Sequence, residues 1–373
     1  MNKNELRTPC YIIHKSKIRH NLEILKEISD SVGCKILLAQ KAFSMYSLYP
    51  FIGNYLAGTT ASGLYEAKLG KEEMGGEVHI FSSAYREDEI DDIINICDHI
   101  IFNSPHQLKK YKTRVLDAGK SIGLRINPEY STQKQAIYDP CSNGSRLGTI
   151  RKYINDELLE GVDGLHFHTL CEQNSDDLKA TLEIVDKNFE SFLKKMKWVN
   201  FGGGHHITRN DYDIKTLKDC INKIQDKYSV QVYIEPGEAI ALNAGTLLTT
   251  VLDIVENNIR IAILDTSAAC HMPDVIEMPY RPPLKNADEA DKLKYTYRLA
   301  GPTCLAGDII GDYSFNSECK IGNKLEFQDM AIYSMVKNNT FNGIRLPDIV
   351  LEEENGEYKL IRSFGYEDFK MRL

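Results

Sequence analysis

The chain has 373 residues, of which 42% are hydrophobic, enough for two ordinary domains or for one barrel with an appended domain. The net charge of −8 is spread along the chain, which argues against a nucleic-acid-binding surface, and no apolar run approaches the roughly 20 residues of a membrane helix. The polar start has no signal-peptide core, and the nine cysteines form no Cys-x-x-Cys pair. We therefore expect a cytoplasmic protein without a disulfide framework.

Short apolar segments alternate with amphipathic helical segments between about residue 34 and residue 240. The segments that we predict to be strands are 35–40, 56–61, 77–82, 99–103, 121–126, 163–168, 197–201 and 230–235. The helical segments between them include 62–69, 87–97, 104–116, 176–196 and 213–227. Such a repeat is typical of a closed parallel barrel with its helices outside, so we predict a TIM-like (β/α)8 barrel over residues 14–242.

The sequence becomes rich in β-type segments after residue 245. These segments are 246–255, 259–264, 293–299, 324–336, 349–354 and 358–363. They show partial alternation of apolar and polar residues, and turn signals such as Asn257-Asn258 separate them. We therefore predict a second domain with an antiparallel β fold, made of residues 1–13 and 243–373.

Four segments with reactive side chains or glycines follow predicted strands of the barrel. They are Lys41, His166–His168, Gly202–Gly204 and Glu235–Glu238. Parallel α/β proteins place their chemistry at the carboxyl ends of their strands, so the sequence predicts one shared pocket. Lys41 is its expected reactive centre, because a buried lysine has a lowered pKa and its neutral amine can bond covalently to an aldehyde. The alternative is a lysine that reaches solvent at a strand end.

The glycine and glutamate segments suit a phosphorylated heterocycle. Gly202–Gly204 lets the backbone approach a phosphate, and Glu235 could hold a proton on a ring nitrogen. A tight turn and an acidic turn cap are the alternatives. His166 and His168 point to the same face of one strand, which suits either stacking on a cofactor ring or binding a metal.

Two further candidates lie in the predicted β domain. Gly301-Pro302-Thr303-Cys304 is a turn followed by a thiol that could donate a proton or act as a nucleophile. Tyr333 lies in the predicted strand 324–336, where its hydroxyl could reach a phosphate. A small buried cysteine and a packing tyrosine are the alternatives.

Taken together and in this order, these segments resemble the fold-type III decarboxylases that use pyridoxal 5′-phosphate (PLP). That group holds the ornithine, arginine and diaminopimelate decarboxylases, with alanine racemase as a structural cousin. The resemblance runs from residues 8–12 to residues 340–343. The segments 165–172, 235–239 and 269–274 are most similar to the branch that decarboxylates carboxynorspermidine and carboxyspermidine.

The resemblance implies a role for each candidate. Lys41 would hold PLP covalently, His168 would stack on the ring, and Glu235 would pair with the pyridine nitrogen. The residues implied to contact the phosphate or lie near the cofactor are Gly203, Gly204, Gly237, Tyr333, Cys171 and Arg125. Cys304 would enter from a partner subunit and protonate the carbanion, which implies a homodimer with shared active sites.

The sequence departs from the family pattern at three places. Glu238 stands where many relatives carry arginine, and Leu305 follows Cys304 where relatives usually have an acidic residue. Asp274 or Asp308 could supply the missing acid, and Glu66 is the nearest candidate for a glutamate expected after the second strand. An acidic site suits a cationic tail, so we expect a carboxylated polyamine as the substrate and Glu238, Asp274 and Asp308 as its ligands.

Several alternatives stay open. The chain could decarboxylate ornithine, arginine or diaminopimelate, or it could be a metal-dependent barrel hydrolase built on His166 and His168. A non-catalytic regulator is disfavoured because Lys41 and Cys304 are both present, and the Gly-Pro-Thr-Cys segment favours decarboxylation over racemisation. We expect no metal, and the choice between the two polyamine precursors stays open.

Overall fold

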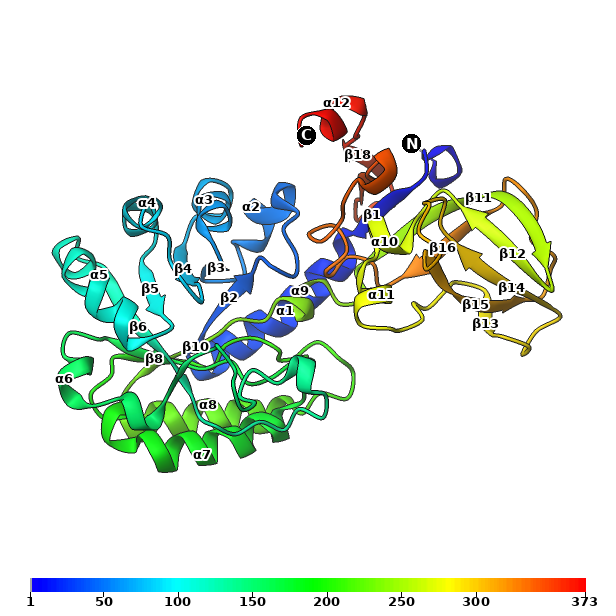
Figure 1. Ribbon diagram of the computed structural model, residues 1–373. Helices are drawn as coiled ribbons and strands as arrows, with labels where there is room; N and C mark the ends of the chain where they lie inside the picture. The colour runs from blue at the N-terminus through cyan, green and yellow to red at the C-terminus, as the bar shows by residue number, and fades with distance from the viewer. Residues whose placement is uncertain (1) are drawn as a thin grey trace. The chain divides into compact units, whose positions relative to one another are not determined.

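The computed structural model describes residues 2–373 and divides the chain into two compact units (Figure 1). One unit is formed by residues 21–240. The other joins residues 241–373 to the N-terminal segment that ends at His20. No helix among the described residues is long and apolar enough to cross a membrane.

The first unit is a closed barrel of parallel strands. In chain order they are β2 (Lys35–Ala39), β3 (Gly58–Ala61), β4 (Glu77–Phe81), β5 (His99–Phe102), β6 (Ser121–Asn127), β8 (Gly164–His166), β9 (Trp198–Asn200) and β10 (Gln231–Ile234). Each strand pairs with the next, and β10 pairs with β2 to close the ring. A short extra strand, β7 (Thr149–Ile150), pairs with the end of β6. The predicted (β/α)8 barrel is confirmed.

Helices cover the outside of the barrel strands. The helices from Lys15 to Ala241 are α1 (Lys15–Val32), α2 (Tyr49–Ile52), α3 (Leu64–Glu73), α4 (Ile90–Ile96), α5 (Pro105–Asp117), α6 (Asp156–Leu159), α7 (Ser175–Leu193), α8 (Ile214–Tyr228) and α9 (Glu238–Ala241). Helix α8 shows why they form: Leu217, Ile221 and Ile224 recur at helical spacing and are buried, while Asp213 caps the backbone of Thr216 at 3.0 Å. Figure 1 shows α7 and α8 side by side.

Aromatic and polar side chains fill the barrel at the end where its strands begin. Trp198 packs with Leu37, Ile101 and Tyr233. Its ring leaves no room for a side chain at Gly123 of β6 or Gly164 of β8. A Cβ would lie 2.5 Å from the ring at Gly123 and 2.0 Å from it at Gly164. This end of the barrel is therefore closed by packed side chains.

The second unit holds a nine-stranded sheet. Its strands are β1 (Cys10–His14), β11 (Gly245–Asn257), β12 (Ile259–Leu264), β13 (Ala287–Glu289), β14 (Tyr295–Ala300), β15 (Ile309–Phe315), β16 (Lys324–Gln328), β17 (Asp348–Glu352) and β18 (Tyr358–Arg362). The sheet is mostly antiparallel, as predicted, but β1 pairs with β17 and β12 pairs with β14 in parallel. Its main core contains Tyr11, Leu247, Tyr313 and Phe327. Short helices in this unit are α10 (Ala268–His271), α11 (Asp274–Glu277) and α12 (Tyr366–Lys370).

The predicted strand 324–336 is wrong in its second half. Strand β16 ends at Gln328, and the next residue, Asp329, has φ of 56°. Tyr333 has φ of 53°, so it too lies in the left-handed region, which an extended strand excludes. Tyr333 therefore lies in a turn-rich segment and not on a strand.

Candidate active site

Lys41 lies two residues after the end of β2, at the carboxyl end of the barrel. The surrounding protein lowers the pKa of its amine, chiefly by desolvation and then through the positive charge of Arg125. The side chain still has accessible surface. The structure therefore provides a reachable amine that loses its proton more readily than an ordinary lysine.

Glu235 directly follows β10 and is 5% exposed. Its Oε1 accepts a hydrogen bond of 2.7 Å from Nδ2 of Asn200, and its Oε2 lies 3.4 Å from Nε2 of His166. Burial alone would raise the pKa of this carboxyl, but His166, His79 and the Asn200 bond together lower it to about 2. Glu235 is thus a buried carboxylate that stays ionised.

Arg125 and His168 lie next to each other in the barrel mouth. Nη2 of Arg125 donates to the carbonyl of His168 at 3.2 Å, and the guanidinium lies over the ring of Phe81, 4.5 Å from its centre. The backbone N–H of Gly203 donates to Nδ1 of His168 at 3.2 Å, so this nitrogen carries no proton. Burial, followed by Lys41 and Arg125, holds the pKa of His168 well below its ordinary value. The imidazole is therefore a neutral flat ring.

Three glycines form a surface that no other residue could provide. A Cβ at Gly204 would lie 2.1 Å from the carbonyl oxygen of Leu170, and one at Gly203 would lie 2.6 Å from that of Glu235. Gly204 also has φ of 81°. A Cβ at Gly237 would lie 2.7 Å from Cβ of Ala42, the residue after Lys41. The backbone at these three glycines therefore carries no side chain, and at Gly237 it lies beside the residue that follows Lys41.

Cys171 and Glu238 belong to the same region. Burial, followed by the charge of Glu238, raises the pKa of the Cys171 thiol to about 11, so Cys171 stays protonated. Oε2 of Glu238 lies 3.2 Å from Nε2 of His206, and the two side chains are 12% and 10% exposed. His206 was not among the residues that the sequence singled out for a role.

Glu66, in the first turn of α3, accepts a backbone hydrogen bond of 2.6 Å from Ser62. Burial raises the pKa of its carboxyl, while that bond and Lys41 lower it. Glu66 thus lies within electrostatic range of Lys41.

Two candidates of the β unit, Cys304 and Asp308, lie at the Gly301–Cys304 turn. The thiol-bearing residue Cys304 is exposed, and its backbone N–H donates to Oδ1 of Asn342 at 2.8 Å. Asp308 is only 3% exposed, and it accepts hydrogen bonds from the hydroxyls of Thr303 at 2.7 Å and Ser267 at 2.9 Å. Asp308 therefore holds this turn in place, with its carboxylate oxygens bonded to neighbours within the β unit.

Asp274 begins α11 and pairs with the ammonium of Lys337, which also lies 2.7 Å from Glu277. Its side chain is 23% exposed. A cationic ligand would therefore compete with Lys337 for this carboxylate.

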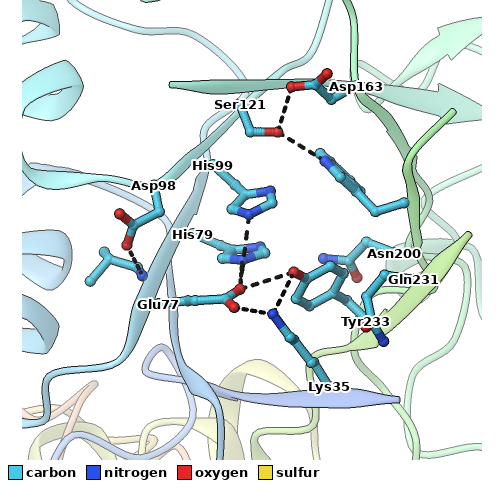
Figure 2. A network of polar contacts seen from close by, with 12 residues as sticks. Lys35, Glu77, His79, Asp98, His99, Ser121, Asp163, Asn200, Gln231 and Tyr233 are labelled. Carbon is cyan, nitrogen blue, oxygen red and sulfur yellow. Dashed lines mark hydrogen bonds and ion pairs between the residues drawn. The ribbon is translucent and has the colours of Figure 1, made fainter. Parts of the chain in front are cut away.

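One group of possible metal ligands was found among residues 2–373: Glu77, His79 and His99 at the start of β4 and β5, shown in Figure 2. Their ligand atoms lie within 4.8 Å of one another. The two imidazoles, however, are stacked 4.0 Å apart with only 15° between their planes, so their in-plane lone pairs do not converge on one point. The ammonium of Lys35 also contacts Glu77. This arrangement favours packing over metal binding.

The His166–His168 pair does not form a metal site either. Nε2 of His166 faces the carboxylate of Glu235, whereas Nδ1 of His168 is used by the backbone of Gly203. The geometry therefore does not support the metal-dependent hydrolase.

The barrel mouth fits the cofactor that the sequence resemblance implies. The bare glycine backbone suits a phosphate, the ionised Glu235 suits a protonated ring nitrogen, and the amine of Lys41 suits an aldehyde. Asn200 and His206 are the residues that sequence reasoning missed. Asn200 ends the strand next to Glu235, and that adjacency in the barrel order is the signal that could have found it.

Comparisons with known proteins agree with this chemistry. The model of the family "pyridoxal-dependent decarboxylase, C-terminal sheet domain" matches residues 10–331. A carboxynorspermidine/carboxyspermidine decarboxylase from Campylobacter jejuni is 44% identical, over 99% of both chains. A carboxyaminopropylagmatine decarboxylase from Synechocystis is 39% identical, over 99% of this chain and 96% of the relative.

A solved structure gives the same result. The crystal structure of carboxynorspermidine decarboxylase from Campylobacter jejuni, complexed with norspermidine, superposes with a TM-score of 0.93. It is 43% identical in sequence, and the match covers 99% of this chain and 100% of the other. The chain therefore belongs to the pyridoxal-dependent decarboxylases.

Proposed function

We propose that this enzyme uses PLP to decarboxylate carboxynorspermidine and carboxyspermidine, forming norspermidine and spermidine in polyamine biosynthesis. The main support for PLP chemistry is that an ionised, buried Glu235 and a readily deprotonated Lys41 both lie at the barrel mouth. The substrate class is supported by the 44% identical relative and by the norspermidine complex of the similar structure.

The proposed cofactor-binding residues are supported by the geometry of the barrel mouth. Lys41 would bind the cofactor aldehyde, Glu235 would hold a proton at the ring nitrogen, and the neutral ring of His168 would lie against the cofactor. The phosphate ligands that we propose are the backbone of Gly203, Gly204 and Gly237, with Cys171 and Tyr333, and Arg125 would lie near the cofactor. PLP, when bound, supplies the electron sink for the carbanion that remains after carbon dioxide leaves.

We propose that Cys304 then returns a proton to the α-carbon from a partner subunit, so that the enzyme acts as a homodimer. The support is the family resemblance together with the exposure of this cysteine. Mixing the inactive variants K41A and C304A tests this idea. In an equal mixture about half of the dimers are hybrids with one intact site, so the mixture should recover roughly a quarter of the native activity if sites are shared, and none if each chain is self-sufficient.

Substrate recognition would use acidic groups. We propose that the carboxylates of Glu238 and Asp274, whose side chains are 12% and 23% exposed, bind protonated amines of the substrate tail. Asp308 is left out because its oxygens bind within the β unit. Diaminopimelate carries a carboxylate at its far end, which Glu238 would repel.

A second candidate substrate is carboxyaminopropylagmatine, which the 39% identical relative from Synechocystis is named for. Its guanidinium tail is also cationic, so the same carboxylates could bind it.

The test is to incubate the purified, PLP-loaded protein with each of the three carboxylated polyamines, and with ornithine, arginine and diaminopimelate, and to measure carbon dioxide. We expect the highest kcat/KM for carboxynorspermidine or carboxyspermidine. Faster turnover of carboxyaminopropylagmatine would establish the second candidate, and faster turnover of an amino acid would reject both.

We also propose a cytoplasmic location, because all nine cysteines are free thiols.

A further inference from the structure

Two loops at the barrel mouth approach each other closely. The first loop (residues 201–208) follows β9, and the second loop (residues 235–239), which includes the start of α9, follows β10. The backbone N–H of Glu235 donates to the carbonyl of Gly202 at 2.8 Å, and the hydroxyl of Thr208 donates to the carbonyl of Ala239 at 2.6 Å. Between these two bonds, His206 faces Glu238 at 3.2 Å.

The His206–Glu238 pair is nearly buried and otherwise unsupported. His206 is 8% exposed, and neither of its ring nitrogens makes a hydrogen bond of good geometry. The acidic group that lies against this ring is the carboxylate of Glu238. A carboxylate with so little contact with water needs such a counter-charge, because burying an unpaired charge is costly.

The second loop also touches the strand end that carries Lys41. The backbone N–H of Ala39 donates to the carbonyl of Pro236 at 3.2 Å, and Gly237 packs directly against Ala42. Glu238 lies within electrostatic range of both Lys41 and Cys171. Glu238 thus lies in a loop that contacts the other glycine loop and the end of β2, and its charge acts on Lys41.

The negative charge of Glu238 is unfavourable for binding a phosphate at this site. A free carboxylate beside the glycine loops would repel a phosphate dianion. A nearby imidazolium would cancel that repulsion.

We propose that His206 is a positioning residue: it acts as the counter-ion of Glu238, and the pair fastens the two glycine loops and lets them retain an anionic cofactor. The proposal rests on the proposed assignment of these loops to the PLP phosphate. It concerns retention of the cofactor and does not depend on which polyamine is the substrate.

The experiment measures the dissociation constant of PLP by absorbance and fluorescence titration of the cofactor-free protein, in the absence of any polyamine. H206F removes the counter-ion and should weaken PLP binding about tenfold, because Glu238 is left as an unpaired charge. E238Q removes the charge and should change binding less than threefold in either direction. The double variant H206F/E238Q should bind PLP several-fold more tightly than H206F alone.

Rescue by the second substitution separates this role from a merely structural one. If His206 only filled space, E238Q would not rescue H206F, and the two effects would multiply. That result, or unchanged PLP affinity in H206F, would overturn the proposal. H206Q, which keeps an N–H donor but carries no positive charge, covers the case in which H206F does not fold, and it should weaken PLP binding by a smaller factor than H206F does. H106F, at an exposed histidine of α5, is the control and should behave as the native protein does.

A failure of the substrate assignment would be visible separately. The protein would then retain PLP with the predicted pattern and yet leave the carboxylated polyamines unchanged.

Discussion

Nδ2 of Asn200 lies 2.7 Å from Oε1 of Glu235, so the last residue of β9 holds the carboxylate that follows β10. Both side chains are buried, and the bond is one of the causes that keep the pKa of Glu235 low. A neutral amide therefore supports the charge of a group that would bind the cofactor ring.

We expect N200L to raise the pKa of Glu235 and to weaken its pairing with a protonated ring nitrogen. A hydrogen bond to a charged group contributes about 1.5–3 kcal/mol, so kcat/KM should fall roughly ten- to hundredfold. Steady-state decarboxylation measured as a function of pH would show this fall. N54L, at an exposed asparagine, is the control, and equal rates in N200L and native protein would contradict the role given to Asn200.

G204A tests whether the first loop needs its bare backbone. A Cβ there would lie 2.1 Å from a backbone oxygen, and the residue has φ of 81°. Gly144 has nearly the same φ, 80°, but nothing within 4 Å of its added Cβ, so G144A isolates the cost of the conformation alone. We expect about 1–2 kcal/mol of destabilisation for G144A and clearly more, with loss of PLP binding, for G204A. Urea denaturation and PLP titration measure the two effects, and equal results for both variants would contradict the clash.

Thiol chemistry tests Cys304. It is the exposed cysteine, whereas the others are buried or half-buried. We expect a thiol-specific reagent to modify Cys304 first, as peptide mapping would show, and modification to remove activity. C304A should lower kcat at least about hundredfold without changing PLP affinity, because it removes a proton donor and not a cofactor ligand. C141A is the control, and full activity in C304A would exclude the proposed proton transfer.

Lys41 should be the residue that carries the cofactor. Borohydride reduction of the PLP-loaded enzyme, followed by peptide mapping, is expected to place the reduced cofactor on the peptide that contains Lys41. K41A should lose the visible absorbance of the bound aldehyde and at least about a thousandfold in kcat. A label on another lysine would reject the assignment. Lys35, which begins β2 and contacts Glu77, is the internal control and should stay unlabelled.

Acid should destabilise the barrel through His99. Burial, followed by His79, lowers the pKa of His99 from 6.5 to about 3. Between these values the unfolded chain binds a proton that the folded chain excludes, so stability falls as pH falls from 6.5 towards 3. The loss at about pH 5 should be on the order of 2 kcal/mol.

We therefore expect H99F to be less sensitive to acid than the native protein. The urea midpoint should drop by a smaller amount between about pH 7.5 and about pH 5 in H99F. H20F, at the exposed His20 of α1, serves as the control and should keep the native pH dependence. An unchanged pH dependence in H99F would show that His99 does not carry this effect.

The barrel could be predicted from the sequence because parallel strands are buried on both faces and appear as continuous apolar runs. Helix α1 was not predicted, although Ile18, Leu22, Leu25 and Ile28 recur at helical spacing and are buried, so the signal was present. The end of β16 was misplaced because Asp329 and Tyr333 adopt left-handed conformations that depend on the surrounding fold.

The residues at strand ends could be predicted in the same way, since the carboxyl ends of parallel strands meet. Asn200 and His206 were not assigned these roles, because their importance comes from partners on another strand or loop; for Asn200 the barrel order, which places the end of β9 beside Glu235, held the signal. For Asp308 the acidic side chain suggested a ligand for a cation, and only the three-dimensional contacts of Thr303 and Ser267 reveal its structural role.

The ring of Trp198 closes one end of the barrel, and Gly123 and Gly164 make room for it. There is consequently no passage along the barrel axis. A carboxylated polyamine must enter and its decarboxylated product must depart by the same opening. Chain-length preference should therefore respond to substitutions in the loops that surround this opening, and remain indifferent to those at the starts of β4 and β5.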